Sequence, residues 1–335
     1  MARPQLTFLC ELEADALGAL FADASVIDDL VALGAGVSLG ILDFSPERAA
    51  VVRRLNKAGI PLTAWLLLPE EEGYWFNVGN APQATACYAD LKAWTAEYSL
   101  QWAGLAMDIE PDIRELRQLL SDPRRAVPSV LRRVFHNEGL RRAQAAYNAL
   151  VAQMHADGYH VESYTIPLIV DERRVGSTLL QRLAGLVDVP TDREVPMLYS
   201  TLFRSYGPGV LWSYAPDAGS VAVGNTGGGV EIEGLKDLPL LNWDEFARDL
   251  RLARRWRDEV HVFSLEGCVR QGFLARLKAF DWEKSVAPPL RTARQVEMLR
   301  KVLRAALWIS VYPVVVLAGL IAVLWLLFRR RLRKK

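Results

Sequence analysis

The sequence predicts an α/β protein built as a (β/α)8 (TIM) barrel and followed by a single C-terminal transmembrane helix. Eight short apolar runs of strand length, most followed by a helical pattern, occupy about the first 285 residues of the 335-residue chain. Repeated strand–helix units favour a parallel sheet, and eight of them in this length favour a closed barrel. An open doubly wound sheet is the alternative for this body, but no glycine-rich turn follows the first strand, as that fold would favour. A long uncharged run near the C-terminus predicts the membrane helix.

The expected strands share an apolar run that ends where polar or turn-forming residues begin. They lie at residues 5–13, 36–44, 60–69, 102–111, 160–170, 194–201, 220–229 and 260–267. The helical patterns between them carry ordinary start signals. For example, Ser45 suits an N-cap, and Pro46 suits the first position of a helix.

Charge divides the chain into an acidic body and a basic tail. From Val286 onward, 11 Lys and Arg residues stand against one Glu, whereas the residues before Val286 carry a net charge of −9. An acidic body lacks the concentrated positive charge that nucleic-acid binding requires, so no nucleic-acid partner is expected. The predicted organisation is a barrel at 1–285, a basic juxtamembrane segment at 286–304, a transmembrane helix at 305–328 and a basic tail at 329–335.

The run from Ala305 to Phe328 contains no charged residue. At roughly 1.5 Å per residue it would form a helix of about 36 Å, long enough for a hydrocarbon core of about 30 Å. The sequence therefore predicts a single-pass protein of the cell membrane that contacts the lipid bilayer through this run. Basic residues flank both of its ends and leave the side of the barrel unresolved. The start of the chain lacks a signal-peptide pattern, which favours the cytoplasmic side.

The fourth expected strand ends in two carboxylates, Asp108 and Glu110. Alternate residues of a strand share a face, so these two lie on the same face as the small residues Gly104 and Ala106. In a barrel, that face lines the interior, and active sites form where the strands end. The pair is therefore expected in the mouth of the barrel, as catalytic groups or as a salt-bridged pair that caps it.

Other strand ends also carry polar side chains. Candidate substrate-binding residues among them are Glu11, Asp43, Asn225 and Glu266, and Tyr199 is a candidate catalytic residue. Asp43, like the nearby Glu13, equally suits a solvated loop or a helix cap.

The loop after the third expected strand combines Tyr74 and Trp75 with Asn77. Exposed rings beside amides suit a sugar, because its C–H faces stack on rings while its hydroxyls bond to amides. Trp65, on the preceding strand, adds a further ring. The alternative is a small apolar cluster packed beneath a long loop.

The sequence lacks the residue patterns that several other kinds of active site require. The four histidines form no H-x-H or H-E-x-x-H pattern, and the three cysteines are widely spaced, so neither a metal site nor a cofactor is expected. A G-x-S-x-G elbow and a P-loop are also missing. The glycine run at residues 224–229 suits a phosphate-binding loop or simply a flexible one.

The segment "GLAMDIE" resembles the D-G-x-D-x-D-x-E signature on the fourth strand of family 18 glycoside hydrolases, the chitinase-like barrels. Gly104, Asp108 and Glu110 match its glycine, last aspartate and glutamate, whereas Ala103 and Ala106 stand in place of its first two aspartates. "MLY", ending at Tyr199, resembles the start of that family's sixth-strand motif M-x-Y-D, with Ser200 in place of the acid. The family's S-x-G-G on strand three is missing, and Glu266 stands on strand eight rather than a tryptophan.

This resemblance implies a glycoside hydrolase that acts on a polysaccharide or glycoconjugate. Glu110 would be the general acid, Asp108 would orient the substrate's acetamido group, and Tyr199 would hydrogen-bond to that group. A second version keeps Glu110 as the acid and uses Glu266 or Glu11 as nucleophile or base. Two alternatives remain: a catalytically inactive carbohydrate-binding barrel, and an enzyme that acts on a phosphorylated or lipid-linked sugar at the inner membrane face.

Overall fold

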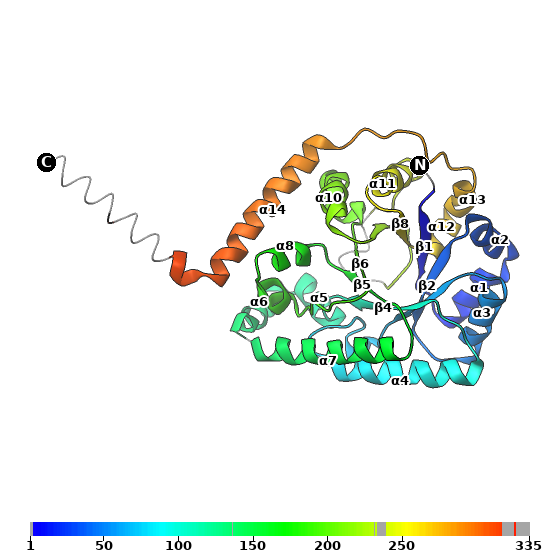
Figure 1. The fold of residues 1–335 in the computed structure, drawn as a ribbon, viewed down its shortest axis with the longest axis horizontal. Helices are drawn as coiled ribbons and strands as arrows, with labels where there is room; N and C mark the ends of the chain where they lie inside the picture. Colours follow the sequence, from blue (N-terminus) through cyan, green and yellow to red (C-terminus); the bar gives the residue numbers. More distant parts are fainter. Residues whose placement is uncertain (1–2, 136, 231, 233–238, 317–324, 326–335) are drawn as a thin grey trace.

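Eight parallel strands form a single sheet that curves into a barrel (Figure 1). The computed structural model describes residues 3–135, 137–230, 232, 239–316 and 325. The strands are β1 (Gln5–Cys10), β2 (Gly36–Ile41), β3 (Leu62–Leu66), β4 (Gly104–Ile109), β5 (Val161–Thr165), β6 (Arg193–Pro196), β7 (Val221–Gly224) and β8 (Glu259–Phe263). Their order in the sheet is β6-β5-β4-β3-β2-β1-β8-β7. A parallel bridge between Met197 and Ala222 joins the two edge strands, so the barrel is nearly closed.

Helices connect the strands and surround them on the outside. The α-helices before β5 are α1 (Ala14–Ala22), α2 (Ala24–Leu33), α3 (Pro46–Lys57), α4 (Ala81–Tyr98), α5 (Ile113–Ser121), α6 (Pro123–Arg132) and α7 (Asn137–Ala156). Those after β5 are α8 (Leu168–Arg174), α9 (Leu179–Ala184), α10 (Gly207–Tyr214), α11 (Trp243–Arg254), α12 (Leu265–Arg270), α13 (Phe273–Leu277) and α14 (Leu290–Val311). Short 3-10 turns lie at η1 (Glu70–Glu72), η2 (Arg133–Phe135), η3 (Ser200–Tyr206) and η4 (Ala215–Asp217).

Local sequence signals explain where several helices begin. The Ser45 side chain accepts a hydrogen bond from the Arg48 amide at 3.2 Å, and Pro46 is the first residue of α3, as predicted. At the start of α11, Asn242 and Glu245 form a capping box in which each side chain bonds to the other's backbone.

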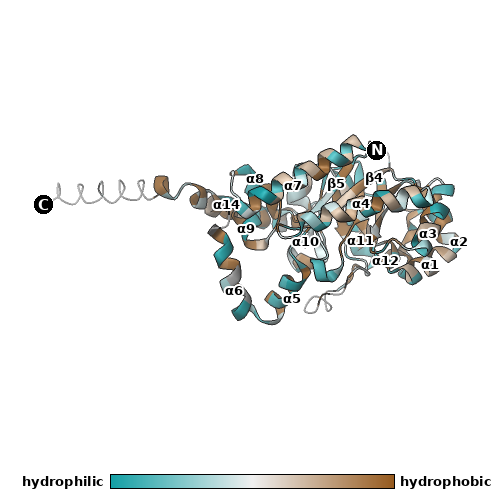
Figure 2. Ribbon diagram, turned by 90° about the horizontal axis from the view of Figure 1, so that it is seen from below, coloured by the Kyte–Doolittle hydropathy of each residue, from teal (hydrophilic) through white to brown (hydrophobic). Residues whose placement is uncertain are grey.

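The alternation along β4 separates two apolar cores. Leu105, Met107 and Ile109 pack in the outer core between the strands and the helices, whereas Ala106 packs in a smaller core inside the barrel. The predicted division of this strand into an outer and an inner face is therefore confirmed. Both hydrophilic and hydrophobic residues occur along α4 and α7 (Figure 2), and their buried positions recur every three or four residues, as expected of helices with one face on a core. The three cysteines are buried and unpaired: Cys10, Cys87 and Cys268.

Helix α14 packs against the barrel. It runs beside α10 and α8 (Figure 1), where Ala293, Val296, Arg300 and Leu307 are buried. The Arg300 guanidinium is 3% exposed and lies against the carboxylate of Asp171, with Nε to Oδ2 at 2.9 Å.

The predicted transmembrane helix at 305–328 is wrong. In the part of the chain that the structure describes, no helix is both long enough and apolar enough to span a bilayer. Helix α14 begins at Leu290, within the basic segment, and it ends at Val311, shortly before Pro313, which has no N–H for a helical hydrogen bond. Residues 317–324 and 326–328 of the predicted span lie outside the described residues. The membrane location and the lipid contact inferred from this span are accordingly not supported.

Candidate functional site

Four carboxyl side chains gather at the mouth of the barrel, where the strands end. Glu11 follows β1, Asp108 and Glu110 stand at the end of β4, and Glu266 lies just beyond β8 on α12. Parallel strands bring their carboxyl ends to one side, which explains why segments so distant in sequence meet there. The carboxyls influence one another: the charge of Glu110 raises the pKa of both Asp108 and Glu11.

Asp108 is nearly inaccessible, with 2% of its surface exposed. Burial, followed by the charges of Glu110 and Glu11, raises the pKa of Asp108 well above its usual value. The nearby indole N–H of Trp65 lowers it. This contact is not a regular hydrogen bond, because Asp108 Oδ1 and Trp65 Nε1 are both buried without a partner among the described residues.

Glu110 is half-buried at the end of the same strand. Burial raises the pKa of Glu110 from 4.5 to about 7. A carboxyl group with such a pKa holds a proton for part of the time near neutral pH, which suits a general acid.

Glu11 receives a hydrogen bond from the phenolic hydroxyl of Tyr74, which reaches it from the loop after β3. Burial raises the pKa of Glu11 to about 8, although this hydrogen bond lowers it, and the charge of Glu266 raises it further. The Val230 backbone amide also stabilises the charged form of Glu11. Glu11 and Glu110 thus have their pKa values raised into the neutral range.

Glu266 is 4% exposed, and neither of its carboxyl oxygens has a regular hydrogen-bond partner among the residues described. Burial raises its pKa, although the neighbouring Ser264 and Cys10 lower it. A glycine turn covers this carboxyl. A Cβ on Gly228 would collide with Glu266 Oε1, and one on Gly229 would lie 2.8 Å from Glu11 Oε2, so only glycine allows the backbone to approach so closely.

Tyr199 lies at the mouth after β6, 8% exposed. Its ring stacks on Phe263 with 5.5 Å between centroids and 23° between planes. Burial and then the charge of Asp108 raise the pKa of Tyr199, so its hydroxyl keeps its proton and remains a hydrogen-bond donor. Ser200, which follows it, donates a hydrogen bond of 2.5 Å to Asp249 on α11.

The aromatic loop after β3 is packed into the barrel rather than exposed. Tyr74 and Trp75 are 6% and 5% exposed, and their rings meet edge to face. The Asn77 side chain bonds to the backbone of its own loop, as acceptor from Gly79 and donor to Trp75. The expectation of exposed rings is therefore wrong. The structure favours the alternative of a cluster packed beneath the loop, with the Tyr74 hydroxyl directed at Glu11.

Two further candidates have local bonding partners. Asp43 forms an ion pair with the fully buried Arg48 at 2.8 Å and accepts a hydrogen bond from the Ser45 amide. Burial alone would raise the pKa of Asp43, but the contacts with Arg48 and Ser45 lower it below its usual value. Asn225 accepts a hydrogen bond of 2.6 Å from the Gly227 amide and so shapes the glycine turn.

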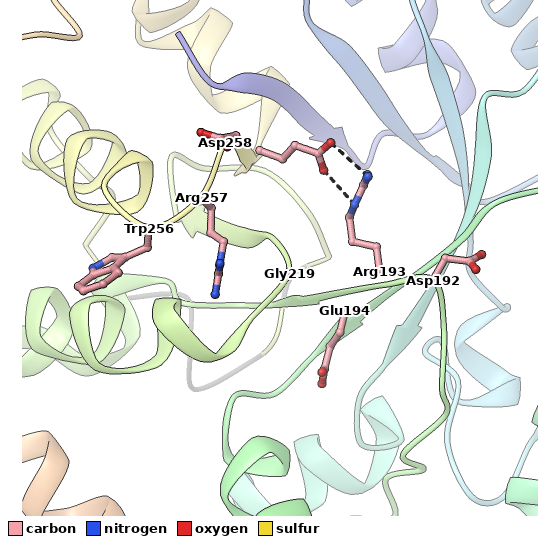
Figure 3. A pocket seen from close by; sticks show the side chains of 8 residues that line it. Asp192, Arg193, Glu194, Gly219, Trp256, Arg257 and Asp258 are labelled. Atoms are coloured by element: carbon pink, nitrogen blue, oxygen red, sulfur yellow. Dashed lines mark hydrogen bonds and ion pairs between the residues drawn. The ribbon is translucent and has the colours of Figure 1, made fainter. Parts of the chain in front are cut away.

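A cavity of about 560 Å³ lies at the opposite end of the barrel, where strands β6 to β8 begin (Figure 3). Its lining residues are Asp192, Arg193, Glu194, Gly219, Trp256, Arg257, Asp258 and Glu259. Arg193 is held between Glu162, at 2.7 Å, and Glu259, at 2.9 Å. Arg257 donates to two backbone carbonyls. Since both guanidinium groups are engaged, this end of the barrel is stabilised by internal ion pairs and hydrogen bonds.

Sequence reasoning missed a buried polar chain beside this cavity. His261 is 2% exposed; its Nε2 lies 3.2 Å from Glu162 Oε2, and its Nδ1 lies 3.0 Å from Ser220 Oγ. Burial opposes the ionisation of Glu162, but His261 and Arg193 lower its pKa. The inward position of His261 on β8, alternating with apolar neighbours, was the available signal.

The side chains at the mouth can transfer protons and form hydrogen bonds. Within the described ranges, no three His, Cys, Asp or Glu side chains are arranged to hold a metal ion. Carboxyls with raised pKa values, a protonated tyrosine and the indole N–H of Trp65 can instead give, take and position protons on a polar ligand.

No protein-family model matches the chain. No curated protein matches it either. Among solved structures it is similar to a GH18 chitinase from Pseudoalteromonas aurantia, with a TM-score of 0.45 and 9% identity over 83% of this chain and 100% of that one. It is also similar to D-allulose 3-epimerase from Methylomonas sp., with a TM-score of 0.42 and 12% identity over 90% and 99%. A third is Gas2p of Saccharomyces cerevisiae in complex with laminaritetraose and laminaripentaose, with a TM-score of 0.40 and 11% identity over 86% and 67%. Likeness of this extent carries no conclusion about activity; the barrel is established by its own strand order.

Proposed function

We propose that this barrel is a glycoside hydrolase that cleaves O-glycosidic bonds, with Glu110 as its general acid. The observation that carries the proposal is the group of four carboxyls at the mouth, two of them buried with unpaired oxygens. Burying carboxyl groups without partners is costly, and such an arrangement is typical of a site that uses them. The resemblance of "GLAMDIE" to the fourth-strand signature of family 18 glycoside hydrolases supports the same residues.

Glu110 would transfer its proton to the glycosidic oxygen while the bond from that oxygen to the anomeric carbon breaks. The positive charge that develops on the sugar ring would favour the ionised form of Asp108, and that carboxylate would stabilise the charge in return. Water would then add to the anomeric carbon and give its proton to a carboxylate, with Glu11 and Glu266 placed to receive it. The Tyr199 hydroxyl would donate a hydrogen bond to the bound sugar.

The raised pKa of Glu110 supports the first of these steps. Since burial raises it to about 7, part of the protein carries the acid form at neutral pH. Asp108 lies on the same face of β4, and its charge would hold that proton more firmly.

The test compares wild type with Glu110→Gln, using the full chain because α14 packs against the barrel. Each protein is incubated with neutral, N-acetylated and amino oligosaccharides, and the products are separated. We expect wild type to cleave at least one substrate and the variant to lose about 10²–10⁴-fold in rate, as expected for removal of a general acid. Glu97→Gln, at an exposed position on α4, is the matched control and should keep full activity.

Two results would count against the proposal. Undiminished cleavage by Glu110→Gln would exclude Glu110 as the acid. If folded wild type bound oligosaccharides and cleaved none, the barrel would be a carbohydrate-binding protein instead.

A further inference from the structure

The mouth of the barrel holds buried acceptor and donor atoms that lack partners. Glu266 is 4% exposed with both carboxyl oxygens unpaired, and Asp108 is 2% exposed with Oδ1 unpaired, in the described part of the chain. The indole N–H of Trp65, 2% exposed, lies next to Asp108 and also lacks a partner. Buried polar atoms are normally hydrogen-bonded, so these three side chains indicate a ligand that supplies both donors and acceptors.

No basic side chain neutralises these carboxyls. None of Glu11, Asp108, Glu110 and Glu266 forms a salt bridge with any residue that the structure describes. Arg48, whose charge acts on the neighbouring Cys10, is held by Asp43. Arg270 lies beside Gly227 of the glycine turn and forms no salt bridge with these carboxyls among the described residues. Because no countercharge offsets their burial, the pKa values of these carboxyls are raised. A cationic ligand would stabilise their ionised forms, whereas an anionic ligand would oppose ionisation.

The hydrogen-bonding and charged groups that the ligand must supply limit its chemical class. Sugar hydroxyls would supply donors to Glu266 and Asp108, and an acceptor for the Trp65 N–H, but they would bring no charge to stabilise the ionised carboxylates. A protonated amine adds three N–H donors and the missing positive charge. A uronic acid or a sugar phosphate would place a further anion among the carboxyls.

The glycine turn and the half-buried Glu110 border these buried carboxyls. Gly228 is exposed, and its backbone approaches Glu266 so closely that a Cβ there would collide with it. The stacked rings of Tyr199 and Phe263 form an apolar wall in the same region, against which the C–H face of a sugar can pack.

We propose that the sugar taken by this site is an amino sugar with a free, protonated amino group, such as a glucosamine unit, held by Glu266 and Asp108. This inference rests on the proposed function for the reaction, but it concerns which sugar binds. It differs from a site built for an N-acetylated sugar, in which an uncharged acetamido group would face these carboxyls.

The test measures binding by calorimetry to the full chain near neutral pH. The probes are tetramers of glucosamine, N-acetylglucosamine and glucose, which differ at one substituent. We expect the glucosamine tetramer to bind at least about tenfold more tightly than the other two, and this margin to shrink as salt screens the charges. Glu266→Gln keeps the shape of the side chain and should remove most of the margin, whereas Glu97→Gln should leave it unchanged.

The outcomes separate this inference from the proposed function. Equal or tighter binding of the N-acetylated or glucose tetramer by wild type would overturn the inference, and Glu110-dependent cleavage of that tetramer would leave the proposed function standing. Tight, salt-sensitive binding of the glucosamine tetramer, lost in Glu266→Gln, would support the inference even if no tetramer were cleaved. Should Glu266→Gln fail to fold, the comparison of the three tetramers and the salt dependence in wild type decide.

Discussion

The hydroxyl of Tyr74 donates a hydrogen bond to the Glu11 carboxylate across the mouth of the barrel. Tyr74 belongs to the loop after β3, and Glu11 follows β1, so the bond ties two strand ends that are not neighbours in the sheet. It also favours the charged form of a carboxyl that burial would otherwise keep protonated. Removing this one hydroxyl should therefore change the protonation of the site without removing a carboxyl.

We predict that Tyr74→Phe raises the pKa of Glu11 above its value of about 8. A hydrogen bond to a charged group contributes roughly 1.5–3 kcal/mol, which corresponds to a rise of about 1–2 pKa units. Carboxyl chemical shifts followed by NMR titration measure this directly. Tyr206→Phe, at an exposed position, is the control. A Glu11 pKa that stays the same or falls would contradict the role of Tyr74.

Stability should fall as the pH rises from about 5 to about 8. The pKa values of Glu11 and Glu110 rise from 4.5 to about 8 and about 7 on folding, so the folded chain binds these protons more tightly than the unfolded chain. Their contribution to stability is complete below the unfolded pKa and is lost as the pH rises through the folded values. Groups with lowered pKa values, such as Glu162, act in the opposite sense, but only at pH values below this window.

Calorimetric melting temperatures across this window test the prediction. The melting temperature should decrease steadily from the acidic to the alkaline side, and Glu11→Gln should flatten the decrease because its side chain does not titrate. A melting temperature that rises with pH in wild type would show that the buried carboxyls are not protonated in the folded protein.

Gly228→Ala should reduce oligosaccharide binding at the mouth more than the strain of an alanine at positive φ alone would. Gly228 has φ +97°, and a Cβ there would collide with Glu266. Gly59 also has a positive φ, +73°, but a Cβ there would meet nothing within 4 Å. Gly59→Ala therefore carries the backbone strain, roughly 1–2 kcal/mol, without the collision. We expect Gly228→Ala to lose oligosaccharide binding and Gly59→Ala to keep it; equal binding by the two variants would show that the turn does not position Glu266.

The barrel could be predicted from sequence because its signals are local. Period-two alternation in β4 placed Asp108 and Glu110 on the inner face, and strand ends indicated Glu11 and Glu266 as well. The partners of these residues could not be predicted, because each contact joins distant segments. Tyr74 and Glu11 are 63 residues apart, and His261 and Glu162 are 99 residues apart. No local pattern identifies which residue of another strand will face a given side chain.

The C-terminal segment shows how hydropathy alone can mislead. A run without charges predicted a membrane helix starting at Ala305, yet α14 already begins at Leu290. Arg300 of α14 lies in the predicted basic segment before that run, where a hydropathy profile counts its charge as unfavourable for burial. In the structure that charge is buried against Asp171, 129 residues earlier in the chain. The packing of α14 depends on a partner that the local sequence does not contain.

Arg300 should be the residue on which the docking of α14 depends most. Its guanidinium bonds to Asp171 and, at 2.7 Å, to Asp217, and it stacks over the ring of Tyr214 at 3.8 Å. Asp171 is fully buried and also accepts a hydrogen bond of 2.6 Å from the Tyr214 hydroxyl. Arg300→Ala would leave the buried Asp171 carboxylate with the longer ion pair to Arg304, at 3.6 Å, as its remaining countercharge. Because removing one partner of a buried ion pair typically costs about 3–5 kcal/mol, we expect a loss of stability up to that range.

Urea denaturation of the full chain measures this cost as a loss in the free energy of unfolding. Lys301→Ala, one residue further along α14 at an exposed position, is the matched control and should change stability by less than about 0.5 kcal/mol. Adding Asp171→Asn to Arg300→Ala should recover part of the loss, because an amide can remain buried without a countercharge. If Arg300→Ala were no more destabilising than Lys301→Ala, the ion pair would not be what holds α14 to the barrel.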